Sequence, residues 1–73
     1  MRYFFNIIEA GIEIPDPEGM DLPGPDAAQK EALAIAFELR AEFPGRFGRH
    51  GVIEVLSEAG QCVFASPIAA PAL

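Results

Sequence analysis

Residues 26–43, DAAQKEALAIAFELRAEF, decide the fold of this chain because they carry its helical pattern. Apolar side chains recur there at spacings of three and four residues, which predicts an amphipathic helix. Asp26 suits the N-cap position, with Gln29 as an imperfect capping-box partner, and Pro44 with Gly45 stops the helix. The predicted core face of this helix consists of Ala28, Ala32, Ile35, Ala36, Leu39 and Phe43.

Leu33 and Phe37 lie four residues apart and belong neither to this core face nor to the acidic, solvated edge formed by Glu31, Glu38 and Glu42. They form a second, smaller apolar stripe, since residues four apart meet on one face of a helix. Two explanations stay open. The helix is broadly buried, with the stripe beneath a loop or the C-terminal tail, or the stripe contacts another subunit.

Apolar, β-branched stretches flank the helix on both sides and predict two β-hairpins. Residues 3–8 and 12–14 form the first around a turn at 9–11, and residues 52–56 and 62–65 form the second around a turn at 58–61. The predicted fold is α+β: a ββαββ chain whose two hairpins make a four-stranded antiparallel sheet, with one helix packed on one face. We expect the first and last strands to lie centrally, because both are apolar on both faces.

The chain is long enough for a single domain, residues 1–73, in which we expect residues 67–73 to be a frayed tail. A domain this small buries only roughly 60% of the surface that its unfolded chain exposes. Yet 51% of its residues are hydrophobic. That excess predicts an apolar contact surface and therefore association with itself or with a larger protein. No apolar run reaches 18 residues, so we expect no membrane span and a cytoplasmic protein.

The net charge of −6 argues against nucleic acid as a partner, because phosphate backbones bind proteins rich in Lys and Arg. The loop at residues 45–51 nevertheless carries Arg46, Arg49 and His50 among glycines. These three side chains are the candidate anion contact, and they give the alternative function of an anion-binding or nucleic-acid-binding regulator. The loop precedes a predicted strand, whereas a phosphate-binding loop opens a helix, so a solvated helix-to-strand connection is the favoured explanation.

Catalytic and metal chemistry find little support. Four acidic residues, Asp16, Glu18, Asp21 and Asp26, follow the first hairpin, but their spacing does not match a calcium-binding loop. The single histidine and the single cysteine, His50 and Cys62, lack an evident third residue to orient them as a base and a nucleophile. We therefore expect no catalytic residue, no metal site and no cofactor, and classify the chain as not an enzyme.

Several short stretches together resemble a family of short alphaproteobacterial proteins known as domain of unknown function 6894. The matching residues are Arg2-Tyr3-Phe4-Phe5, Asp16, Glu18-Gly19, Leu22, Ala27-Ala28, Glu31-Ala32, Ile53-Glu54-Val55, Glu58, Gly60 and Val63. The Gly24-Pro25 step and the glycine-rich 45–51 loop depart from the pattern of a typical member. The resemblance implies a ββαββ domain and brings no activity, cofactor or catalytic residue with it.

We therefore expect a small non-enzymatic protein-interaction module that acts as a homo-oligomer or accessory subunit. Leu33 and Phe37 are the candidate interface residues.

Overall fold

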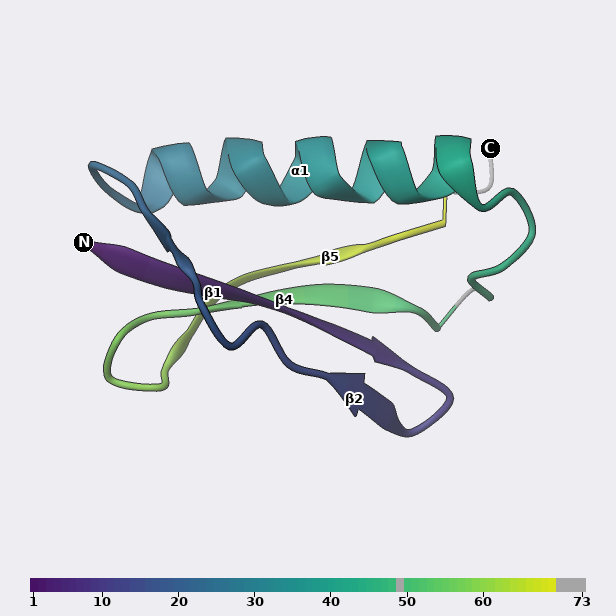
Figure 1. Cartoon of the computed structure of the whole chain (residues 1–73), viewed down its shortest axis with the longest axis horizontal. Helices are drawn as coiled ribbons and strands as arrows, with labels where there is room; N and C mark the ends of the chain where they lie inside the picture. The colour runs from purple at the N-terminus through teal and green to yellow at the C-terminus, as the bar shows by residue number, and fades with distance from the viewer. Residues whose placement is uncertain (49, 70–73) are drawn as a thin grey trace.

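The computed structural model describes residues 1–48 and 50–69, and within them the chain is a sheet with one long helix along one face (Figure 1). The strands are β1 (Arg2–Glu9), β2 (Ile12–Ile14), β3 (Met20–Asp21), β4 (Val52–Leu56) and β5 (Cys62–Pro67), and the helix is α1 (Pro25–Glu42). The predicted α+β fold of two hairpins with one helix between them is therefore correct, with β3 as an additional short strand.

The strands follow the order β2-β1-β4-β5, all antiparallel, and β3 pairs with the start of β1 beside β2. The expected central position of β1 is confirmed, whereas β5 lies at an edge and β4 takes the second central place. Pro67 explains this correction, since proline lacks an N–H for the ladder and is confined to edge strands. Cys62, Val63 and Ala65 of β5 are correspondingly exposed.

Positive φ angles close the first hairpin. Ala10 and Gly11 have φ of 52° and 78° between the paired residues Glu9 and Ile12. Two consecutive positive φ angles are what a type I′ turn needs, and this turn matches the twist of the two strands. The predicted turn at residues 9–11 is therefore in place.

The helix begins two residues earlier than the sequence predicts. Gly24 is the N-cap, Pro25 opens the helix, and no side chain caps it, so the predicted capping role of Asp26 is wrong. Proline suits the first helical position because its φ is already helical and its missing N–H would have no partner there. Asp26 instead lies in the first turn, where a carboxylate interacts favourably with the helix dipole. The predicted end is correct, with Glu42 last and Phe43 as the C-cap.

Three alanines bring α1 close to the sheet. Ala28, Ala32 and Ala36 are buried at i, i+4 spacing, and they pack with Tyr3, Phe5, Ile53 and Val55 of the strands. Of the other predicted core-face residues, Ile35 and Leu39 pack at the margin of the core, while Phe43 is 49% exposed. The sheet therefore meets small side chains at its centre and larger ones at the rim.

The C-terminal segment is packed further than the expected frayed tail allows. Ile68 is fully buried, its N–H donates to Gly51 O at 3.0 Å, and its carbonyl accepts from Arg40 Nη1 at 2.8 Å. Ile68 thus joins the core just after β5 ends, and the last positions of the expected tail, 70–73, lie outside the described residues.

Candidate functional site

The acidic loop after β2 is held together by Asp16. One carboxylate oxygen accepts the backbone N–H of Phe5 at 3.2 Å, and the other accepts the N–H groups of Glu18 and Gly19 at 3.3 and 3.1 Å. Phe5 belongs to β1 between the segments that β2 and β3 cover, so Asp16 supplies an acceptor where no strand pairs with β1. A structural role accounts for this carboxylate.

The other acidic residues of the proposed cation cluster have separate positions. Asp21 pairs with Arg2, with 3.0 Å between Oδ2 and Nη2, and Asp26 lies in the first turn of α1. Glu18 contributes its backbone carbonyl, which accepts from Arg2 Nη1 at 2.6 Å. Among the described residues, no group of three or more His, Cys, Asp or Glu side chains is arranged to hold a metal ion.

The residues that carry the family resemblance lie where the fold needs them. Gly19 has φ of 72°, and a Cβ there would lie 2.8 Å from Tyr3 O and 2.9 Å from the Phe4 ring, so only glycine fits. Glu58, in the turn of the second hairpin, accepts the backbone N–H of Arg2 at 2.8 Å. These contacts connect the loop, the first strand and the last hairpin, and none of them leaves a group aimed at a ligand.

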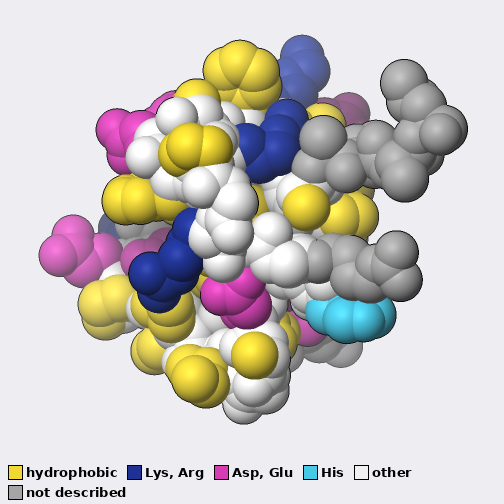
Figure 2. All heavy atoms as spheres, turned by 90° about the vertical axis from the view of Figure 1, so that its right-hand side faces the viewer, with side chains coloured by type: hydrophobic (Ala, Val, Ile, Leu, Met, Phe, Trp, Pro, Cys, Tyr) yellow, Lys and Arg dark blue, Asp and Glu magenta, His cyan; other side chains and the backbone are white. Residues whose placement is uncertain are grey.

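The candidate anion contact is only partly described. Arg46 and His50 are exposed, and Arg49 lies outside the described residues. Arg46 lines a small hollow with the apolar side chains of Ile7, Leu39 and Phe43, among others. Figure 2 shows the histidine on the surface, with Lys and Arg side chains scattered among acidic and hydrophobic ones. The described side chains on this face therefore form no continuous basic patch.

His50 and Cys62 lie at opposite ends of the second hairpin. Cys62 pairs with Leu56 at the end of β4, whereas His50 precedes the start of β4 at Val52. With a rise of ~3.3 Å per strand residue, the two side chains are separated by more than roughly 13 Å. The fold does not bring them together as a base and a nucleophile.

Apolar surface is the more prominent feature. Within residues 1–48 and 50–69, eight large hydrophobic side chains are exposed by more than a third: Met1, Ile12, Ile14, Met20, Leu33, Phe37, Phe43 and Val63. Some of them line a groove of about 410 Å³ between α1 and the edge formed by β2 and β3, with Ile7, Ile14 and Ile35 on its walls. The groove exists because α1 packs mainly on β4 and β5.

Leu33 and Phe37, the candidate interface residues, are 46% and 64% exposed. Burial beneath a described loop is thus wrong for both, and the remaining part of that explanation, the segment at 70–73, lies outside the described residues. The Phe37 ring has the Arg40 guanidinium 5.7 Å from its centroid, so the exposed stripe is bordered by a cation. The pair is available for contact on the helix surface.

The outer edge of β5 is a candidate that the sequence prediction missed by placing this strand centrally. Ile68 N–H donates to Gly51 O, so the alternate pairs Ser66–Ile53 and Phe64–Val55 also exchange hydrogen bonds. The N–H and C=O of Ala65 consequently point away from β4, and no described strand pairs with them. Pro67 in the sequence was the available signal, because it marks an edge strand.

Comparison with known proteins gives one match. Residues 2–69 match the model of a family described as a domain of unknown function, DUF6894. No curated protein and no solved structure matches the chain. Also, the described residues include no helix that is both long and apolar enough to span a bilayer. Because the matched segment extends from the start of β1 to beyond β5, this chain belongs to the DUF6894 family.

Proposed function

We propose that this protein is a small, non-enzymatic interaction module that acts in the cytoplasm as a homo-oligomer or as an accessory subunit of a larger protein. The observation that carries this proposal is the set of large hydrophobic side chains left exposed on so short a chain, above all Leu33 and Phe37 on α1. Burying apolar surface contributes a favourable free energy of about 25 cal/mol per Å². A complex in which a partner covers these side chains would therefore be stabilised.

The second hypothesis, binding of an anion or a nucleic acid by Arg46, Arg49 and His50, draws less support. Arg46 borders an apolar hollow, the chain has a net charge of −6, and no described hydrogen bond orders the side chains of Arg46 or His50. Salt-dependent binding to a nucleic acid would favour it over the interaction module, since phosphate contacts weaken steeply as salt rises.

Light scattering on the purified chain over a range of micromolar concentrations tests self-association. We expect a mass of at least twice 7.8 kDa at the upper concentrations, falling on dilution. A mass of 7.8 kDa throughout would contradict the homo-oligomer. Co-purification of the native protein from its own cells, followed by identification of stoichiometric partners, then tests the accessory role.

A further inference from the structure

Both edges of the sheet offer strands to a partner, but they are protected very differently. On one side, β2 and β3 have three and two residues, Glu13 lies on β2, and Asp16 occupies the N–H of Phe5 between them. Short strands and inward-turned carboxylates are ways in which proteins block edge pairing. On the other side, β5 has six residues, CVFASP, none of them charged.

We propose that the partner of β5 is a second copy of this chain, whose β5 pairs with it antiparallel about a two-fold axis at Ala65. This proposal rests on the proposed function and specifies which surface performs it. In this pairing each Ala65 N–H donates to the Ala65 carbonyl of the other copy, because both groups point outward. The alanine side chains are small enough to lie side by side across the axis.

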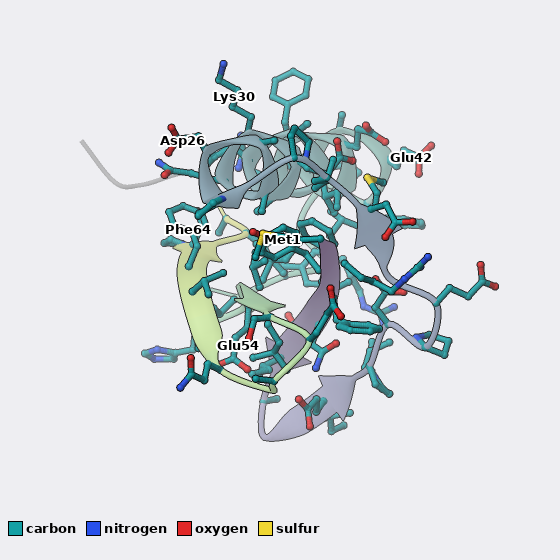
Figure 3. All side chains as sticks on the ribbon, turned by 90° about the vertical axis from the view of Figure 1, so that its left-hand side faces the viewer. Met1, Asp26, Lys30, Glu42, Glu54 and Phe64 are labelled. Atoms are coloured by element: carbon teal, nitrogen blue, oxygen red, sulfur yellow. The ribbon has the colours of Figure 1, made fainter. Side chains whose placement is uncertain are left out.

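The helix supports this arrangement because its exposed leucine faces the same edge. Asp26, Leu33 and Arg40 are spaced by seven residues and so share one flank of α1. Arg40 donates to the carbonyl of Ile68, just after β5. In Figure 3, Asp26 lies on the side of the helix where Phe64 of β5 lies, and Glu42 lies on the other side. Leu33 therefore lies on the side of α1 that is nearest the outer edge of β5.

The spacing of the two helices fits helix packing. Since α1 packs on both β4 and β5, its axis lies inside the sheet edge by a fraction of the ~4.8 Å between strands. Across a pair of β5 strands, the two helix axes would then be roughly 10 Å apart, which is the distance at which helices pack. Pairing the β5 strands of two copies thus brings the sides of the two helices that carry Leu33 into contact, without any change of the fold.

The register along the helices agrees as well. In Figure 1, α1 runs in the same direction as β5. Pro25 and Val63 line one hollow near the start of both elements, and Arg40 is bonded to Ile68 near their ends. Measured from the Arg40–Ile68 hydrogen bond, Leu33 lies seven residues back along the helix, about 10.5 Å, and Ala65 lies three residues back along the strand, about 10 Å. The axis through Ala65 therefore passes near Leu33.

Charge complementarity follows from this register. Asp26 and Arg40 each lie seven residues from Leu33, in opposite directions. Antiparallel helices centred on Leu33 therefore place Asp26 of each copy opposite Arg40 of the other, which gives two ion pairs. Glu31, Glu38 and Glu42 lie on the far flank of α1, so most of the helix's negative charge stays away from the contact.

Two variants with matched controls test this surface by sedimentation equilibrium. Leu33→Asp puts a carboxylate on the helix contact, whereas Ala34→Asp puts one on the neighbouring exposed position outside it. Ala65→Pro removes the outward N–H without touching the bonds to β4, whereas Ala65→Ser keeps that N–H. We expect Leu33→Asp and Ala65→Pro to raise the dimer Kd by at least about tenfold and the two controls to leave it close to that of the parent.

Circular dichroism of each variant establishes whether it is folded, and if Ala65→Pro unfolds, the comparison of Leu33→Asp with Ala34→Asp decides. Equal Kd values for those two variants in an associating parent would overturn the β5 surface and leave the interaction module standing. A parent that is monomeric at all concentrations would overturn both the surface and self-association, and would leave the edge of β5 to a strand from another protein.

Discussion

Asp16 shows how one side chain replaces a stretch of missing sheet. Between β2 and β3 the chain leaves the edge of β1, and the carboxylate of Asp16 accepts the Phe5 N–H that would otherwise have no partner. The amide of Asn6 completes the arrangement, since its Oδ1 accepts the N–H of Asp16 at 2.9 Å and its Nδ2 donates to Glu13. The fold of the loop therefore depends on Asp16.

Asp16→Ala removes the acceptor of three backbone N–H groups and should lower the free energy of unfolding by about 1–3 kcal/mol. Urea denaturation followed by circular dichroism measures the change. Glu18→Ala is the matched control, because Glu18 takes part in these contacts through its backbone alone, and it should stay within about 0.5 kcal/mol of the parent. Equal losses for the two variants would contradict the assigned role of Asp16.

At the scale of elements, the sequence predicts the helix and both hairpins because their periodicities are local. The helix end, the turn at Ala10 and Gly11, and the turn before Cys62 all follow from glycine and proline positions. Strand order is not local, because it depends on which strands of the two hairpins meet. Apolar composition placed β5 in the centre, although Cys62, Val63 and Ala65 are exposed and the strand ends in proline.

The alanine row of α1 gives a test at this scale. Ala32 is fully buried against the sheet, so Ala32→Leu would force the helix away from β4 and β5 and should destabilise the domain by about 1–3 kcal/mol. Ala34→Leu makes the same change on the exposed face and should leave thermal stability nearly unaltered. If both variants melt at the temperature of the parent, the close approach of helix and sheet is wrong.

At the scale of the whole molecule, the family match and the structure agree that the matching residues build the fold. Tyr3, Phe5, Ala28 and Val55 are buried, and Gly19 fits a position that excludes any side chain. The candidate site was only half predictable. Leu33 was found by its helical spacing, whereas the edge of β5 emerged only when the ladder showed which way the N–H of Ala65 points.

Amide hydrogen exchange at Ala65 tests the central claim most directly. Phe64 and Ser66 direct their N–H groups toward β4 and serve as internal standards, protected whether or not the chain associates. We expect Ala65 to be protected comparably at concentrations where the mass is twice 7.8 kDa, and to lose protection on dilution while Phe64 and Ser66 keep theirs. If the Ala65 amide of the associated protein exchanges as fast as an amide that has no hydrogen bond, pairing through β5 is contradicted.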